Sequence, residues 1–472
     1  MIDPIVVGPP AGMLGVVGAV VLLAALLSGL VERSRLPQIV IFLALGVALG
    51  RLGLGVIDLD LDSPAVRVIA TLGLVLVLFM DAVGVSWTAL RRYARTAAII
   101  LGPGTLVTAG VVGVAAYVLL DLTVAESAIL GAALASTDPV LLRGILRSPA
   151  TPEAARTALR IESGMNDAVL LPIILVAMGL LAGPGAEPVR SGSLVASGFE
   201  GLLLGGGAGV VVAVGAVGAL HVVRERIGMQ HDYESLYALG VALAAYAAAE
   251  AVHGSGFIAA FVAGLTIATL DIELCDCFVD YGQATAEMAL LFTFVALGGY
   301  ALWRGLDVAD ARTLLFAGVA LFARGLILLP LIGATGLDAR SRRIVVWFGP
   351  RGLSSLLLVL LPFFAGVPGS DRLFAVTALV VLCSIVVHGG SQVFLAQPER
   401  ASAPEPPTDR ITLEELDDLR RRGERVVILD ARKQDTDPTR AAGAIRVPPD
   451  RAVETVSALG LPRDAWLASY CT

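Results

Sequence analysis

The chain has little charge and little cysteine for its length. Charged residues make up 16% of its 472 residues, whereas soluble globular proteins carry roughly 25%. Its four cysteines are too few and too scattered for a disulfide framework, and one Cys-x-Cys pair is only a weak indication of a metal site. The cysteines are Cys275, Cys277, Cys383 and Cys471. The net charge is −7 without a basic stripe, so no nucleic acid is expected as a partner.

A basic leader is missing as well. No Lys or Arg precedes the first apolar run, which begins near Met13, and Arg33 and Arg35 follow it. This order is the reverse of that in a secretory signal peptide. We therefore interpret the first run as a membrane span.

Apolar residues dominate the rest. They make up 56% of the chain, and the mean hydropathy is +0.82. Apolar runs of about 18 or more residues recur, and each is long enough to cross a hydrocarbon core of about 30 Å. The sequence predicts an all-α polytopic membrane protein with 13 spans, at 12–30, 36–54, 65–87, 96–119, 125–146, 157–182, 194–222, 234–252, 255–271, 285–303, 312–333, 342–365 and 371–395.

The arginines indicate the topology. With the N-terminus outside, 14 arginines fall in inside loops and five in outside loops, the bias typical of a cell-membrane protein. One expected inside loop, 271–287, is acidic and does not fit. The inside arginines are Arg33, Arg35, Arg91, Arg92, Arg95, Arg143, Arg147, Arg156, Arg160, Arg224, Arg226, Arg340, Arg342 and Arg343, and the outside ones are Arg51, Arg190, Arg304, Arg312 and Arg372.

The composition changes after the last span. We expect a membrane domain at residues 1–396, a Pro-rich linker at 397–410 and a small module at 411–472. In the module, Thr412 and Glu415 form a capping-box pattern, and "RVVILDAR" reads as a buried strand. The module is therefore expected to be a small α/β unit, on the cytoplasmic side because the span count is odd.

Ionisable side chains inside the spans are the candidates for function. Each costs about 2.5–3.5 kcal/mol at the centre of a spanning helix, so such residues face protein or water. In the sixth span, Ser163 and Asp167 share one helix face, and Glu162 and Asn166 share a second face. One of the two carboxylates can thus face a cavity and exchange its ligand. The other carboxylate can be neutralised by a cation from a neighbouring helix. The full set is Asp81, Asp138, Glu162, Asp167, Arg324 and Arg351.

The fifth span contains "ASTDPVLL". Pro139 removes a backbone hydrogen bond and disfavours α geometry at Asp138, so the helix is expected to break there. A break at membrane depth frees carbonyl groups that can bind a small cation. Asp138 would lie near the N-terminus of a half-helix and is counted among the candidate ion-binding residues. The alternative is a simple proline kink.

The twelfth span contains "WFGPRGLSSLLL", in which Arg351 lies between a proline and a glycine. An unpaired guanidinium would be expensive at that depth. Glu162 is its expected partner, and we interpret the two as a structural ion pair. Direct ion handling by either residue is the alternative.

Three segments carry a family resemblance. "STDPV", "ESGMNDAV" and "WFGPRGLSSLLL", in this order and each inside a span, resemble the signature segments of sodium/proton antiporters of the NhaP and animal exchanger type. "LPQIVIFLALGVALG" is similar to the second helix of that family. The resemblance implies a thirteen-helix inverted-repeat bundle with two broken helices that cross near the midplane. It also implies a homodimer that works as a transporter rather than an enzyme, with no cofactor besides the transported Na⁺ or K⁺ and H⁺.

The same resemblance implies roles for individual residues. Asp167 would hold either a proton or the cation, and Asn166 beside it resembles the electroneutral branch of the family. Ser163, the backbone of Thr137 and Asp81 would complete the Na⁺ shell. The family's buried ion pair is matched by Glu162 and Arg351, and Arg324 matches a second recurrent arginine.

The tail carries a second resemblance. "ITLEELDDL", "VVILDAR", "AAGAIRVPPD" and "LPRDAWLASYCT" are similar to the first part of a rhodanese domain, with Asp430, Arg432 and Cys471 at matching positions. The loop that would hold the thiolate does not follow Cys471 in this sequence, so the rhodanese-like domain is expected to be partial and inactive.

Three functional hypotheses follow. The leading one is a monovalent cation:proton antiporter, with Na⁺ as the first cation and K⁺ as the second. A membrane-anchored sulfurtransferase or redox sensor would use the tail, and an anion carrier would need a more basic cavity. The four histidines, His221, His231, His253 and His388, are interpreted as satisfied or solvated residues at span ends and loops.

Overall fold

The structure is a computed structural model with two units, Met1–Gln397 and Pro398–Thr472. In the first unit it describes residues 38–51, 53–55, 61–85, 87–148, 150–181, 194–226, 231–270, 276–299 and 301–395, together with three positions before residue 38. In the second unit it describes mainly residues 424–431, 443–447 and 466–470. The linker expected at 397–410 lies outside these residues, as do Arg432 and Cys471.

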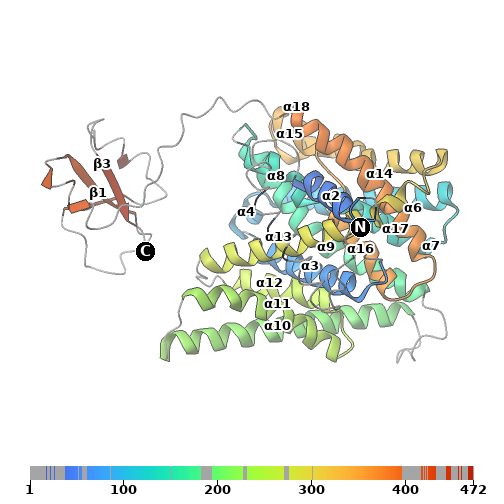
Figure 1. The fold of residues 1–472 in the computed structure, drawn as a ribbon, viewed down its shortest axis with the longest axis horizontal. Helices are drawn as coiled ribbons and strands as arrows, with labels where there is room; N and C mark the ends of the chain where they lie inside the picture. Colours follow the sequence, from blue (N-terminus) through green and yellow to red (C-terminus); the bar gives the residue numbers. More distant parts are fainter. Residues whose placement is uncertain are drawn as a thin grey trace, which may run out of the picture. The chain divides into compact units, whose positions relative to one another are not determined.

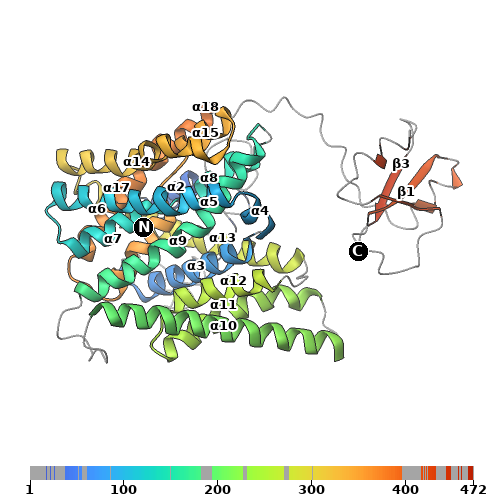
Figure 2. The same ribbon diagram turned by 180° about the vertical axis from the view of Figure 1, so that it is seen from behind.

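The first unit is helical (Figures 1 and 2). Its α-helices are α2 (Gln38–Leu49), α3 (Pro64–Val83), α4 (Trp87–Arg92), α5 (Ala94–Ile99), α6 (Leu106–Leu120), α7 (Val124–Ala135), α8 (Pro139–Arg147), α9 (Glu153–Leu181), α10 (Leu194–Arg226), α11 (His231–Ala251), α12 (Gly256–Thr269), α13 (Asp276–Gly299), α14 (Ala311–Leu331), α15 (Ala339–Trp347), α16 (Leu353–Phe364), α17 (Ser370–Ser384) and α18 (Gly390–Leu395). Two π-helices, η1 (Ile100–Thr105) and η4 (Ile385–Gly389), and two 3₁₀-helices, η2 (Ala301–Gly305) and η3 (Ile332–Thr335), join some of them.

The helices confirm the predicted polytopic membrane fold. Within the described residues, seven stretches are long and apolar enough to cross a membrane, and four shorter helices are also apolar. The expected span 12–30 lies almost wholly outside the described residues. Each of the other twelve expected spans overlaps one helix, or helices joined by a break, a π turn or a 3₁₀ turn.

One predicted boundary is wrong. The sequence favoured a loop over 271–287, but α13 already begins at Asp276.

Helix α9 lies between two groups of helices. In both views α10, α11 and α12 lie side by side along one edge of the unit, and α14, α15 and α18 lie at the opposite edge (Figures 1 and 2). Helix α9 packs against α7, α8, α15 and α16 on one side and against α3, α10 and α12 on the other. A side chain in the middle of α9 is therefore placed between both groups.

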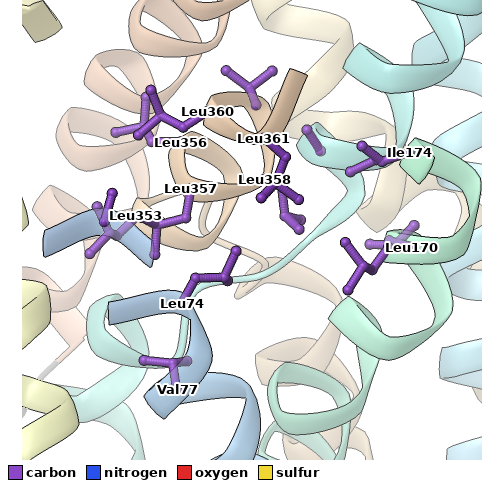
Figure 3. Packing of buried hydrophobic residues seen from close by; sticks show 14 of the residues in the cluster. Leu74, Val77, Leu170, Ile174, Leu353, Leu356, Leu357, Leu358, Leu360 and Leu361 are labelled. Atoms are coloured by element: carbon purple, nitrogen blue, oxygen red, sulfur yellow. The ribbon is translucent and has the colours of Figure 1, made fainter. Parts of the chain in front are cut away.

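The buried core surrounds α16. Every residue from Leu353 to Leu361 is buried, as expected of a helix that is apolar on all sides. Leu74 and Val77 of α3 and Leu170 and Ile174 of α9 belong to the same cluster (Figure 3). This packing holds α3, α9 and α16 together.

The second unit contains a small parallel sheet with the strand order β2–β1–β3. Strand β1 (Val426–Asp430) pairs with β2 (Ile445–Arg446) and with β3 (Trp466–Tyr470). The segment "RVVILDAR" thus forms the expected strand, and its last three strand residues are buried. Parallel strands need crossover connections, so the sheet agrees with the expected α/β class. The rhodanese resemblance stays a prediction.

Helices α6 and α7 approach each other at glycines. A Cβ on Gly131 of α7 would lie 2.7 Å from the backbone nitrogen of Gly113 on α6 and would also meet the carbonyl oxygen of Ala109. No side chain fits between two backbones at this spacing. The contact therefore depends on glycine at position 131.

We expect Gly131→Ala to lower the free energy of unfolding by about 1–3 kcal/mol, because it overpacks a close contact. The control is Gly110→Ala on the exposed side of α6, where nothing lies within 4 Å of an added Cβ; it should raise stability by about 1 kcal/mol or less. Unfolding of the purified variants in detergent measures both. Equal stabilities of the two variants would contradict the close packing of α6 and α7.

Candidate functional site

The fifth expected span is broken, as its proline predicted. Helix α7 ends at Ala135 and α8 begins at Pro139, and the backbone at Ser136 and Asp138 is extended. Pro139 has no N–H to donate, and its ring disfavours helical geometry in the residue before it. The sequence therefore places an extended stretch of three residues inside the span.

The twelfth expected span is broken too. Helix α15 ends at Trp347 and α16 begins at Leu353, with a non-helical stretch between them. The two breaks touch, since the backbone N–H of Asp138 donates to the carbonyl oxygen of Pro350 at 3.0 Å. Four half-helices thus meet at one place in the bundle.

Asp138 caps two of these half-helices. Its Oδ1 accepts hydrogen bonds from the backbone N–H of Val140 at 2.7 Å and of Leu141 at 3.4 Å. Its Oδ2 accepts from the backbone N–H of Leu353 at 2.5 Å. Because helix N-termini favour a negative charge, one carboxylate stabilises both α8 and α16. This capping role differs from the ion-binding role expected from the sequence, and Asp138 is not part of the ion shell proposed below.

Two arginines donate hydrogen bonds to the C-terminal ends of the other two half-helices, α7 and α15. The Nη1 of Arg351 donates to the carbonyl oxygens of Ala135 at 2.6 Å and Ser136 at 3.0 Å, where α7 ends. The Nη1 of Arg324 on α14 donates to the carbonyl oxygen of Val345 at 2.8 Å, in the last turn of α15. Cations at helix C-termini are favourable for the same electrostatic reason. Three charged side chains thus satisfy several of the free backbone groups at the two breaks.

The expected ion pair between Glu162 and Arg351 is wrong. Glu162 is held by Arg324 instead: the Nε of Arg324 donates to Oε1 of Glu162 at 2.5 Å, and Nη2 donates to Oε2. Both side chains are buried. Arg351 makes no ion pair with any carboxylate that the structure describes, because its guanidinium is directed at the end of α7. The two-point contact between Arg324 and Glu162 is of the planar kind that gives the stronger ion pairs.

Asp167 and Asn166 face the break in the fifth span. The hydroxyl of Ser136 donates to Oδ1 of Asp167 at 2.5 Å, and Nδ2 of Asn166 donates to Oγ1 of Thr137 at 2.8 Å. All four side chains are buried. The structure therefore brings together Asp167, Asn166 and Thr137 of the expected site and adds the hydroxyl of Ser136 to them.

Asp81 and Ser163 border the same place. Asp81 of α3 is half-buried, and a Cβ on Gly164 of α9 would lie 3.9 Å from its Cβ. Asp167 and Asp138 are close enough to act on Asp81 electrostatically. Ser163 is buried one helical turn before Asp167. Asp81 of α3 and Ser163 of α9 are therefore near neighbours on the chain or in space of the residues that contact the break in the fifth span.

Sequence reasoning missed three polar residues of this region. Ser136 lies in the quoted "ASTDPVLL" but was not singled out, because spacing along one helix does not show which hydroxyl faces another helix. Ser384 accepts a hydrogen bond from the backbone N–H of Arg351 at 2.7 Å. His388, expected to be a satisfied or solvated residue at a span end or loop, is buried within η4.

Comparison with known proteins identifies a family. Residues 19–397 match the family described as sodium/hydrogen exchanger, transmembrane. The K⁺/H⁺ antiporter NhaP2 of Shewanella oneidensis is 27% identical over 390 residues, which are 81% of this chain and 66% of that protein. The Na⁺/H⁺ antiporter NhaP of Pseudomonas aeruginosa is 28% identical over 429 residues, covering 82% of this chain and 98% of that protein. The chain thus spans slightly less than two thirds of the length of the Shewanella relative.

A solved structure shows the same fold. The sodium proton antiporter MjNhaP1 from Methanocaldococcus jannaschii at pH 8 superposes with a TM-score of 0.63 at 22% sequence identity. The match covers 81% of this chain and 97% of that one. At this identity the likeness concerns the arrangement of the helices.

We expect Glu162→Gln to lower the free energy of unfolding by about 3–5 kcal/mol, because it leaves the buried Arg324 without its counter-charge. Asp121→Asn is the control. It removes an ion pair with Arg312 whose side chains are 77% and 69% exposed, so it should change stability by about 1 kcal/mol or less. Denaturant titration in micelles compares the two. Similar losses in both variants would contradict the structural role of the buried pair.

Proposed function

The chain belongs to the family of transmembrane sodium/hydrogen exchangers, and from this premise we propose that it exchanges a monovalent cation for protons across the membrane. One observation carries the proposal. The carboxylate of Asp167 is buried inside the sixth expected span, and it accepts a hydrogen bond from the Ser136 hydroxyl of the broken fifth span. The named activities of the Shewanella and Pseudomonas relatives, K⁺/H⁺ and Na⁺/H⁺ antiport, support the same reaction class.

The proposed mechanism is competition for one carboxylate. Asp167 binds either a proton or the cation, and an empty, ionised Asp167 is costly in an apolar environment. The protein therefore changes its open side only when the site is filled, which couples the two fluxes. Asn166 beside it adds no charge, so one proton per cation, an electroneutral exchange, is the proposed stoichiometry.

The proposed ion shell uses oxygen-bearing residues of α3, of α9 and of the break in the fifth span. Asp167, Ser163, the backbone carbonyl of Thr137 and Asp81 are its members, since small hard cations prefer carboxylate, hydroxyl and carbonyl oxygens. The Oδ1 of Asn166 is buried and accepts no hydrogen bond from the described residues, which makes it a further available oxygen. Na⁺ is the proposed cation and K⁺ the alternative, because the two named relatives differ in this respect.

Topology and assembly are proposed on sequence grounds. The excess of arginines in the expected inside loops supports an outside N-terminus and a cytoplasmic tail. A homodimer is proposed from the family resemblance. A membrane-anchored sulfurtransferase is not favoured, since the family match lies within residues 19–397 and leaves the tail as an appendage.

We expect Asp167→Asn to abolish cation-dependent proton movement while the protein still folds, because an amide cannot alternate between proton and cation. Asp371→Asn, at a 65% exposed side chain paired with Arg304, is the control and should leave exchange unchanged. Fluorescence dequenching in everted vesicles with Na⁺, K⁺ and Li⁺ across pH measures both the loss and the cation preference. Exchange retained by Asp167→Asn would overturn the mechanism.

We expect Asp81→Ala to raise the apparent KM for the cation at fixed pH more than it lowers stability, because it removes one oxygen ligand from a half-buried position. Loss of one charged contact corresponds to a rise of about tenfold or more. The same vesicle assay at graded Na⁺ concentrations gives KM, and melting in detergent gives stability. An unchanged KM would remove Asp81 from the shell.

A further inference from the structure

The last expected span contains a buried polar pair that the exchange mechanism does not use. Ser384 is the last residue of α17 and His388 lies in the π-helix η4, and their side chains are buried. π turns are rare and often occur at functional sites. The pair lies beside the break of the twelfth span.

Ser384 holds the backbone of that break. Its Oγ accepts the hydrogen bond from the N–H of Arg351 at 2.7 Å. Arg351 lies between α15 and α16, so this N–H has no carbonyl of its own helix to bind. Because a buried N–H without a partner is costly, the hydroxyl of Ser384 determines where this part of the break lies.

His388 orients that hydroxyl. Its Nδ1 lies 3.2 Å from Oγ of Ser384. Since the oxygen of Ser384 uses a lone pair to accept from Arg351, its own proton is available, and Nδ1 accepts it in the tautomer that carries the ring proton on Nε2. The ring of His388 also packs against Trp347 with 6.1 Å between the ring centroids. His388 thus contacts both Trp347 at the end of α15 and Ser384, which accepts the hydrogen bond from Arg351 in the break.

Residue-to-residue hydrogen bonds connect Ser384 and His388 to the proposed ion site, through Arg351 and Ser136. The side chain of Arg351 donates to the carbonyl oxygen of Ser136, and the hydroxyl of Ser136 donates to Asp167. We propose that Ser384 and His388 are positioning residues that set the place of the Arg351 segment and, through it, of the Ser136 hydroxyl beside Asp167 during cation exchange. This inference rests on the proposed exchange function. Neither residue touches the cation.

The variants distinguish positioning from general stability. Ser384→Ala and His388→Leu should each raise the apparent KM for Na⁺ about 2- to 10-fold, the loss of one hydrogen bond, with little change in maximal rate per protein. His388→Asn keeps an acceptor near the place of Nδ1 and should retain a KM close to that of the wild type. The double variant Ser384→Ala/His388→Leu should raise KM no more than one single variant, because the two act as a unit.

Thr377→Val is the matched control. Thr377 is also buried in α17, but its hydroxyl donates to the carbonyl oxygen of Leu373 in its own helix, so the variant should not alter KM. A second measurement does not depend on transport. Amide hydrogen exchange of residues 348–353 should be faster in Ser384→Ala and in His388→Leu than in the wild type or in Thr377→Val.

The outcomes separate the two proposals. If wild-type protein exchanges cations and Asp167→Asn does not, an unchanged KM in Ser384→Ala and His388→Leu overturns only the positioning role. If Asp167→Asn retains exchange, the proposed mechanism fails, and hydrogen exchange at 348–353 still decides whether the pair fixes the break. If Ser384→Ala melts too early to assay, the comparison of His388→Leu with His388→Asn decides, and equal KM values would contradict the proposal.

Discussion

The structure depends on satisfying backbone groups where two helices break inside the membrane. No water competes for hydrogen bonds in the hydrocarbon region, so a broken helix there must find partners within the protein. The partners are charged side chains placed by the sign of the helix ends: Asp138 at two N-termini, and Arg351 and Arg324 at two C-termini. Glu162 neutralises Arg324 in turn. Most of the costly charge in the bundle is explained by this arrangement.

The remaining acidic groups are those that the arrangement does not use. Among the described residues, Asp167 and Asp81 cap no helix end. Asp167 accepts a hydrogen bond from Ser136 in the extended stretch of the fifth span, and Asp81 lies beside Gly164 of α9. The break therefore has two consequences. It needs charges to hold it, and it presents the hydroxyls of Ser136 and Thr137 to α9, where the carboxylate proposed to exchange ions lies. The charges that hold the break therefore lie near the proposed ion site because the same interruption of the helix creates the need for both.

Much of this could be predicted from the sequence. Pro139 predicted the break because its effect is local, and the apolar runs predicted the spans because each reflects the thickness of the bilayer. The partner of Glu162 could not be predicted, since two buried arginines, Arg324 and Arg351, were available and helix spacing describes only the faces of one helix. The sequence left open whether His388 is satisfied or solvated, because its spacing does not show which neighbouring helices cover it. In the structure it is buried beside Ser384.

The double cap made by Asp138 has a mechanical consequence. One carboxylate bonds to the first turns of α8 and α16 at once, so these two half-helices cannot slide past each other without losing a shared anchor. Any motion that exposed Asp167 to the other side of the membrane would have to move the starts of α8 and α16 together, or else break the cap that they share.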